Sequence, residues 1–247
     1  MKNSRLVRKL GHFTRLSQDD KEVLEALCRS RPRRFGPRDT IIGEGERPQT
    51  VSLFLDGWAC RHKGLEDGRR QIISLFLPGD LCDINIFILK QMDHSISAVT
   101  PVTVAEVTRE MFEAIVEGHP RIAQALWWES LVSAAIQREW TTSLGQRDAK
   151  ERISHLLCEL YVRLDCVGLV ERCSCQLPLS QAEIGEMTGL TAVSVNRVLQ
   201  DLRHAGLIDL KSRVLTIHDL PALERIALFN ANYLHLEGEG KHLAANQ

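Results

Sequence analysis

The stretch that most constrains the fold of this chain runs from Leu179 to Leu210 and has the pattern of two short helices joined by a glycine. Ser180 followed three residues later by Glu183 is a capping box, which predicts the start of the first helix. Thr191 is a second N-cap residue. Gly189 lies between the two helices, where a left-handed residue can end the first one. Apolar residues then recur at helical spacing, at Val195, Val198, Leu199 and Leu202. The spacing predicts a helix-turn-helix unit.

The polar face of the second helix is the candidate functional surface, because such a helix can lie in the major groove of DNA. We expect contacts to phosphates from Ser180, Gln181 and Thr191. We expect the residues that face bases to be Ala192, Val193, Ser194 and Arg197. An arginine can donate two hydrogen bonds to O6 and N7 of guanine. The spacing alone also fits a helical hairpin in any small α domain.

The segment after this unit predicts a wing. Gly206 ends the second helix, and Val214–Ile217 is typical of a short strand after a turn at Lys211–Arg213. Leu179 to Leu202 follow the pattern L-S-Q-x-E-I-G-x-x-x-G-L-T-x-x-x-V-x-R-x-L-x-x-L. This pattern resembles the C-terminal domain of the CRP/FNR family of bacterial transcription regulators. The resemblance implies a winged helix-turn-helix that binds double-stranded DNA, and a regulator that contacts RNA polymerase.

The resemblance also implies which positions read the bases, namely those of Ala192, Val193 and Arg197. Well-known members of the family carry an acidic residue at the position of Val193, and that residue accepts a hydrogen bond from cytosine. Valine cannot accept one, but it can contact the methyl group of thymine. We therefore expect an operator sequence that differs from the usual one of the family.

The N-terminal half has a different periodicity. From Arg33 to about Thr108 short strand-like runs alternate with Gly, Pro and Asp turns, which predicts an antiparallel sandwich or barrel. Their order resembles the β-roll of cyclic-nucleotide-binding domains. The residues that carry this resemblance are Gly43–Glu46, Leu55–Gly57, Asp67–Arg69 and Leu77–Leu81. The predicted fold class is therefore α+β, with an antiparallel β-roll, a long dimerisation helix and a C-terminal winged helix-turn-helix domain.

The roll departs from the cyclic-nucleotide pattern where the ligand would bind. Binders of the family have a Gly-Glu pair for the ribose and an Arg-Ser pair for the cyclic phosphate. This chain has Asp83 in the first region and Asp93-His94-Ser95 in the second, and an aspartate repels a phosphate. We predict that cyclic AMP does not bind. Any effector would meet Asp83, His94 and Ser95. The apolar run Ile84–Leu89 fits either a filled core or an apolar effector pocket.

A long helix is predicted between the two halves, from Arg121 to Leu144 after Pro120. Its apolar stripe is made of Ile122, Leu126, Val132, Ile136 and Trp140. The resemblance implies that this helix pairs with the same helix of a second subunit, and the alternative is that the stripe packs on its own roll. Gly145 is the expected hinge.

These expectations divide the chain into four parts. Residues 1–118 are predicted to form the sensor roll with an N-terminal helix that begins at Ser17, and 119–145 the dimerisation helix with its hinge. Residues 146–225 are predicted to form the DNA-binding domain, with a helix over Arg147–Leu164 and a loop over Asp165–Leu177. Residues 226–247 would complete a helix over Leu220–Leu236 and end in a mobile tail from Glu237.

The composition limits the other classes of function. The net charge is −1, so the attraction to DNA must come from local charges. No run reaches the roughly 18 apolar residues of a membrane helix, and the basic N-terminus lacks the apolar core of a secretion signal. We expect a cytoplasmic protein that does not associate with membranes.

The cysteines and histidines predict no cofactor. The seven cysteines are Cys28, Cys60, Cys82, Cys158, Cys166, Cys173 and Cys175. Only Cys28 precedes Cys60, which argues against the N-terminal iron–sulfur cluster of some family members. Cys166, Cys173 and Cys175 lack the spacing of a common zinc site, and the histidines form no metal motif. These three cysteines fit either surface thiols without a role or thiols used in redox control. We expect no metal and no catalytic residues.

The function predicted from the sequence is sequence-specific DNA binding by a homodimeric CRP/FNR-type transcription regulator on a palindromic site, without dependence on cyclic AMP. One alternative is a small-molecule-binding regulatory subunit that acts through a protein partner. A β-roll enzyme is a second alternative, and the missing metal ligands disfavour it.

Overall fold

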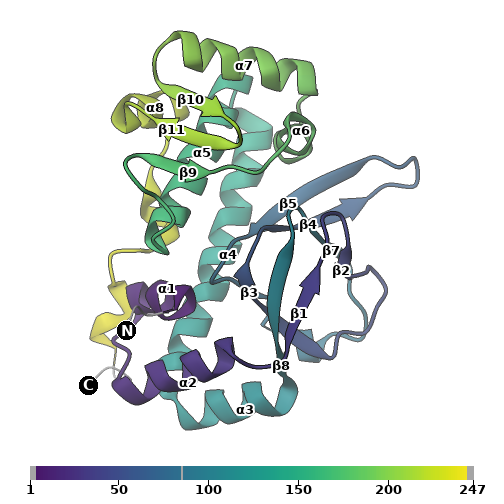
Figure 1. Cartoon of the computed structure of the whole chain (residues 1–247), viewed down its shortest axis with the longest axis vertical. Helices are drawn as coiled ribbons and strands as arrows, with labels where there is room; N and C mark the ends of the chain where they lie inside the picture. Colours follow the sequence, from purple (N-terminus) through teal and green to yellow (C-terminus); the bar gives the residue numbers. More distant parts are fainter. Residues whose placement is uncertain (1–3, 85, 244–247) are drawn as a thin grey trace. The chain divides into compact units, whose positions relative to one another are not determined.

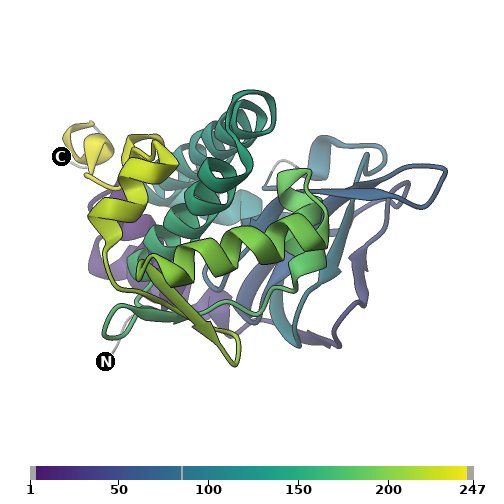
Figure 2. The same ribbon diagram turned by 90° about the horizontal axis from the view of Figure 1, so that it is seen from above.

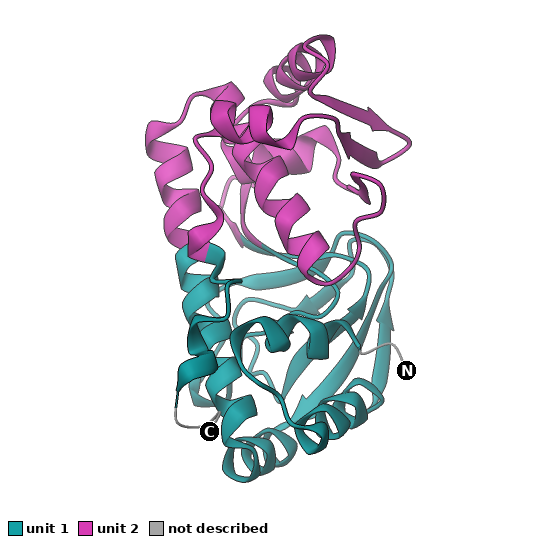
Figure 3. Cartoon of the chain, turned by 90° about the vertical axis from the view of Figure 1, so that its left-hand side faces the viewer, with its two compact units in different colours: residues 1–62, 75–135, 234–247 teal, residues 63–74, 136–233 magenta. Residues whose placement is uncertain are grey.

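The computed structural model describes residues 4–84 and 86–243, which form two compact units. Unit 1 comprises residues 1–62, 75–135 and 234–247, and unit 2 comprises residues 63–74 and 136–233 (Figure 3). Unit 1 contains most of the predicted roll, and unit 2 contains the predicted helix-turn-helix. Within the described ranges, none of the helices meets the length and hydropathy that a transmembrane span requires.

The N-terminal part is an antiparallel roll, as predicted. One sheet has the strand order β1-β8-β3-β6 and the other has the order β2-β7-β4-β5. The strands are β1 (Pro32–Phe35), β2 (Thr40–Ile42), β3 (Thr50–Asp56), β4 (Ala59–Gly64), β5 (Arg70–Phe76), β6 (Leu81–Cys82), β7 (Ser95–Ala98) and β8 (Val102–Thr108). The central pair is β3 and β8, in which Val51 lies opposite Val107 and Leu53 opposite Ala105, all four of them buried. The sequence did not predict β1, whose residues are mostly exposed, or the two-residue β6.

Helices accompany the roll in unit 1 (Figure 1). They are α1 (Arg5–Phe13), α2 (Gln18–Cys28) and α3 (Arg109–Gly118), and a short 3-10 helix, η1, covers Ile86–Ile88. The predicted start of α2 is confirmed, since the Ser17 hydroxyl accepts from the Asp20 backbone N–H and the Asp20 carboxylate accepts from that of Ser17. The sequence did not predict α1, which buries Leu6, Leu10 and Phe13.

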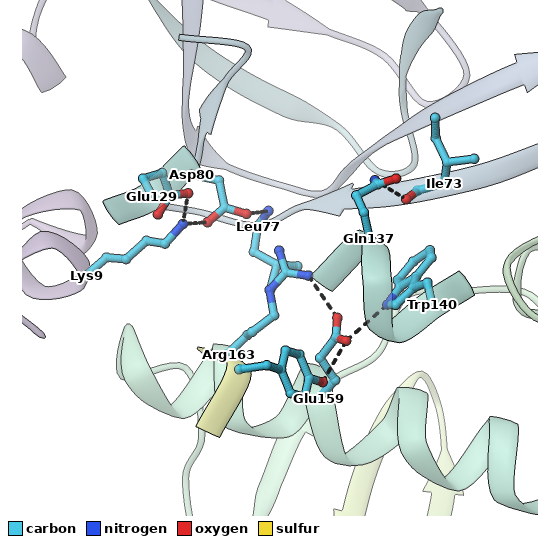
Figure 4. Close-up of polar contacts among 10 residues, drawn as sticks. Lys9, Ile73, Leu77, Asp80, Glu129, Gln137, Trp140, Glu159 and Arg163 are labelled. Atoms are coloured by element: carbon cyan, nitrogen blue, oxygen red, sulfur yellow. Dashed lines mark hydrogen bonds and ion pairs between the residues drawn. The ribbon is translucent and has the colours of Figure 1, made fainter. Parts of the chain in front are cut away.

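A buried lysine fixes α1 in unit 1. The Lys9 ammonium lies 2.6 Å from a carboxylate oxygen of Asp80 and also bonds Glu129 of the long helix α4, Pro120–Gln146 (Figure 4). Burial lowers the pKa of Lys9, but the two carboxylates outweigh burial and the net pKa is raised. The ammonium is therefore charged, and it joins α1, the loop after β5 and α4 through charge-assisted hydrogen bonds.

Helix α4 (Pro120–Gln146) is longer than predicted and continues through Gly145. The helix therefore does not end at Gly145, and the role of this residue as a hinge stays a prediction. The break comes after Gln146, where Asp148 caps helix α5 (Ala149–Cys166) and forms a capping box with Glu151. A carboxylate that satisfies the first N–H groups of a new helix fixes this position, whereas glycine only tolerates a break.

The apolar stripe of α4 also differs from its predicted role. Each of Ile122, Leu126, Val132, Ile136 and Trp140 is at most 8% exposed. These side chains are already buried within the chain, so the expectation that they form a seam with a second subunit was wrong. The alternative, a stripe that packs on its own roll, is met only in part, because Trp140 contacts Glu159 of helix α5.

Unit 2 is mainly helical, with a small sheet. Its elements after α5 are β9 (Ser174–Gln176), α6 (Gln181–Thr188), α7 (Ala192–His204), β10 (Ile208–Lys211), β11 (Val214–Ile217) and α8 (Leu220–Ala227). The three strands pair in the order β10-β11-β9, so the predicted loop over Asp165–Leu177 contains a strand that the sequence did not reveal. Its core includes Ile153, Leu157, Val195, Leu202 and Leu215.

A buried carboxylate joins α4, α5 and the C-terminal segment within unit 2. Glu159 is fully buried and accepts hydrogen bonds from Trp140 Nε1 at 3.0 Å and from the Tyr233 hydroxyl at 2.9 Å. Arg163 Nη1 lies 3.3 Å from its other oxygen (Figure 4). Burial raises the pKa of Glu159, and these partners only partly oppose it.

The C-terminal segment is folded differently from the prediction. The helix expected over Leu220–Leu236 ends at Ala227, because Leu228 is left-handed with φ 49°. Two 3-10 helices follow, η2 (Ala231–Leu234) and η3 (Glu239–His242). The predicted mobile tail therefore includes an ordered turn up to Leu243, and its last residues, 244–247, lie outside the described part of the chain.

Candidate nucleic-acid interface

Helices α6 and α7 begin at the predicted caps and meet at the predicted glycine. The Ser180 hydroxyl accepts from the Glu183 backbone N–H at 3.2 Å, and the Thr191 hydroxyl accepts from that of Ser194 at 3.2 Å. Gly189 has φ 65°, which a glycine adopts without strain. Gly185 permits a close approach, because a Cβ there would lie 2.4 Å from the Leu190 carbonyl oxygen. The predicted helix-turn-helix is therefore present.

Helix α7 has one buried and one exposed face. Val195, Val198, Leu199 and Leu202 are each at most 4% exposed. The opposite face is exposed at Thr191, Ala192, Val193 and Arg197, with Val193 80% exposed. In Figure 2, α7 and the β10–β11 hairpin lie in front of the other elements of unit 2. A polar helix face that no other part of its own unit covers is available to a partner.

The hydroxyl groups at the start of α7 are already engaged with one another. The Ser194 side chain is half-buried, and its hydroxyl lies 3.0 Å from the Thr191 hydroxyl. Each hydroxyl retains further hydrogen-bonding capacity. Ser180 and Gln181 are exposed at the start of α6. The structure thus brings the predicted phosphate-binding and base-reading residues onto adjoining helix starts.

Asn196 is a candidate residue that the sequence reasoning missed. It is exposed beside Arg197, and its amide oxygen accepts a hydrogen bond from Gln181 Nε2 at 3.1 Å. Helical spacing alone could have identified it, since Asn196 follows Val193 by three positions and therefore shares its face. An asparagine can make two hydrogen bonds to adenine, which adds a second base-reading group to this face.

The wing carries cations on a strained turn. Ser212 and Arg213 connect β10 and β11 and both have left-handed backbones, with φ 52° and 63°. A two-residue hairpin of this type normally contains asparagine and glycine. Lys211 and Arg213 are exposed there. Strained backbone of this kind is often found at functional sites, and here it lies between two exposed cations. This fits a role of the wing in binding phosphate.

The predicted effector residues of the roll are only partly brought together. Asp83 bonds the guanidinium of Arg61, and His94 Nε2 lies 3.0 Å from Asp83 and 3.1 Å from Arg61 Nε. Ser95 lies apart, and its hydroxyl accepts from the Glu44 backbone N–H at 3.0 Å. Burial raises the pKa of Asp83, but hydrogen bonding to His94 and the charge of Arg61 outweigh burial and lower it. The sequence reasoning did not include Arg61.

The apolar run after Asp83 is divided. Ile84 and Ile86 are buried, whereas Ile88 is 80% exposed and Leu89 is 40% exposed. The described part of the run therefore both fills the core and leaves apolar groups on the surface.

The cysteine and histidine side chains form no metal site among the described residues, where no group of three or more potential ligands occurs. Cys173 is exposed and Cys175 is buried. Burial raises the pKa of the Cys175 thiol to about 11, which disfavours the reactive thiolate.

Comparisons with known proteins identify both halves of the chain. A cyclic nucleotide-binding domain model matches residues 32–119, and a Crp-like helix-turn-helix domain model matches residues 151–226. The transcriptional activator protein FnrL of Cereibacter sphaeroides is 28% identical over 210 residues, which cover 84% of this chain and 83% of that protein. The nitrogen fixation regulation protein FixK of Azorhizobium caulinodans is 29% identical over 206 residues, covering 83% and 82%.

Solved structures show the same architecture. The structure of FixK2 from Bradyrhizobium japonicum covers 82% of this chain and 99% of its own, with a TM-score of 0.71 and 25% identity. A CRP-family transcriptional regulator from Thermus thermophilus covers 80% and 97%, with a TM-score of 0.61 and 27% identity. With both domains matched and the helix-turn-helix in place, the chain belongs to the CRP/FNR family of transcription regulators.

Proposed function

We propose that this regulator binds a specific double-stranded DNA sequence through the exposed face of α7. The observation that carries the proposal is that Val193, Asn196 and Arg197 are exposed together while the opposite side of the same helix is buried. Arg197 and Asn196 supply the hydrogen bonds to base edges, and Val193 supplies an apolar contact. Ala192 and Ser194 complete the face that meets the bases.

Phosphate contacts come from the edges of this surface. Ser180, Gln181 and Thr191 lie at helix starts, where backbone N–H groups and hydroxyls favour an anion. Lys211 and Arg213 of the wing add positive charge. These contacts fix the register of α7 on the duplex but do not select its sequence.

The test is the substitution Arg197→Ala on an operator selected from a random DNA pool. We expect a loss of about 1–3 kcal/mol in specific binding and relaxed selectivity at one base pair, because one bidentate contact is removed. Arg203→Ala is the matched control, since Arg203 is also exposed on α7 but lies in its last turn. Equal losses on operator and random DNA would show that Arg197 contacts only the backbone.

We also propose that the regulator acts as a homodimer on a two-fold symmetric site, paired through α4. The exposed residues Trp127, Leu131, Ala134 and Thr141 recur at spacings of four, three and seven, which is a heptad pattern. Trp127 is 72% exposed and Leu131 is 56% exposed. Two copies of α7 then read half-sites one helical turn apart.

Arg152 connects α4 to the helix-turn-helix within unit 2. Its guanidinium donates to the carbonyl oxygens of Thr188 at 2.6 Å, Arg147 at 2.9 Å and Leu144 at 3.3 Å. These oxygens belong to the end of α6, the break after α4 and the last turn of α4. We place the joint at Arg147–Asp148, where a signal would shift an existing equilibrium between DNA-competent and incompetent dimers.

The regulator is proposed to work without cyclic AMP. Arg61, Asp83 and His94 bond one another in the roll, and Asp93 lies 2.7 Å from His94 Nδ1. Two carboxylates in this cluster repel a phosphate, and the arginine is already engaged. Calorimetry of the purified protein with millimolar cyclic AMP should show no binding heat, and a saturable signal would contradict the proposal.

Two further assignments follow from the family. A DNA-binding regulator acts on the chromosome, so we place the protein in the cytoplasm. Transcriptional activators such as FnrL are among its relatives, and we propose RNA polymerase as a protein partner.

A further inference from the structure

A cationic cavity lies in unit 1, between segments that are far apart in the sequence. It has a volume of about 470 Å³ and is bounded by α1, the start of α2 and η3. Arg8, Arg15, Lys21 and Lys241 line it together with His12. Figure 1 shows α1, α2 and the C-terminal segment as neighbours. The size is within the range of small-molecule sites.

The charge of this cavity has one sign. None of the described residues that line it carries a carboxylate. Cations held close together repel one another, and a concave site lined by one sign concentrates the field and attracts counter-ions. An anionic ligand would remove this repulsion and make charge-assisted hydrogen bonds to Arg8, Lys21 and Lys241.

Close packing brings η3 to the cavity. A Cβ at Gly240 would lie 2.6 Å from the Phe13 carbonyl oxygen, so only glycine permits this approach to the end of α1. Gln124 Nε2 of α4 donates to the Gly240 carbonyl oxygen at 3.2 Å. These contacts fix the position of η3, and Lys241 therefore lines the same cavity as the cations of α1 and α2.

Gly11 keeps the cavity open. It lines the cavity on α1, and a Cβ added to it would meet nothing within 4 Å. Glycine weakens a helix interior relative to most residues, so its presence in α1 leaves space at the expense of helix stability.

We propose that this cavity binds a small ligand with two or more linked phosphate groups, such as an inorganic or nucleoside di- or triphosphate. Several cations around one hollow match adjacent negative charges better than a single anion. The hollow is open to solvent, but its limited size favours a small ligand over a duplex, whose backbone needs an extended surface.

The test is calorimetry of the full chain with inorganic triphosphate, and with orthophosphate at equal ionic strength as the comparison. We expect saturable binding of one triphosphate per chain and much weaker binding of orthophosphate. The double variant Lys21→Gln/Lys241→Gln should lose about tenfold or more in affinity, because two charge-assisted contacts are removed. Arg34→Gln/Arg47→Gln is the matched control, since it removes two exposed cations outside the cavity and should bind as wild type does.

A second variant separates a cavity from a diffuse charge effect. Gly11→Leu fills the space without removing any charge, should raise the melting temperature of the protein and should abolish triphosphate binding. Unchanged binding in Gly11→Leu, or an equal loss in the Arg34/Arg47 control, would overturn the proposal. The affinity for random duplex DNA gives a further test. If the double lysine variant binds this DNA more weakly than wild type while Gly11→Leu binds it equally well, the cations form a surface for nucleic acid and the proposal is overturned.

Discussion

At the scale of single residues, His155 shows how burial decides charge. It is 2% exposed in unit 2, and its ring lies 5.1 Å from that of Phe229 and 6.0 Å from that of Tyr233. Burial and the charge of Arg147 lower its pKa to about 3. A carboxylate oxygen of Glu139 lies 3.5 Å from His155 Nε2, but this carboxylate does not offset the effect of burial on the pKa of His155. The imidazole is therefore neutral in the folded protein at neutral pH.

This neutral histidine predicts a pH-dependent loss of stability. The unfolded chain takes up a proton near pH 6.5, whereas the folded chain does so only near pH 3. The free energy of unfolding should fall as the pH drops through this window, by up to about 1.4 kcal/mol per pH unit. His155→Phe keeps a ring and removes the titration, so denaturant unfolding of both proteins between pH 7 and 5 should diverge. Parallel plots of the free energy of unfolding against pH for the two proteins would contradict the prediction. Taking the difference between the two proteins at each pH removes the contribution of other titrating groups, such as Glu159, which are the same in both.

At the scale of elements, local chemistry made the helix-turn-helix predictable. Ser180, Thr191 and Gly189 each specify a helix end through bonds to the nearby backbone, and the apolar period of α7 specifies its buried face. Ser17 did the same for α2. The sequence could therefore identify the elements of the site and most of its exposed residues. Asn196 was missed only because its spacing from Val193 was not followed.

Other elements could not be predicted because distant residues determine them. An apolar stripe on α4 shows that one face is covered, but not whether a second subunit or the same chain covers it. The joint after α4 depends on Asp148 as a cap rather than on Gly145. Strand β9 forms because β11 pairs with it. Arg61 meets Asp83 and His94 only after the roll has formed, so the ion cluster was invisible to spacing.

At the scale of the whole molecule, the exposed stripe of α4 is the feature that a single chain does not explain. Trp127 and Leu131 leave large apolar surfaces in water on a helix whose other side is buried. Burying such a side chain contributes about 1.5–3 kcal/mol. A second copy of α4 would cover both residues in each chain, and dimerisation would couple two α7 helices to one symmetric site.

The dimer can be tested by placing charge on this stripe. Trp127→Glu/Leu131→Glu should give a monomer in sedimentation equilibrium, because like charges and lost apolar burial act together at the seam. Ile88→Glu/Leu65→Glu is the control, since Ile88 and Leu65 are 80% and 57% exposed but belong to other segments than α4, so the dimer should stay intact. The monomer should retain weak binding to a half-site and lose the gain in affinity from a second half-site. A stable dimer with both glutamates in place would exclude α4 as the seam of the dimer. Binding of the variant to a single half-site with unchanged affinity would leave the proposed role of α7 in DNA binding unaffected.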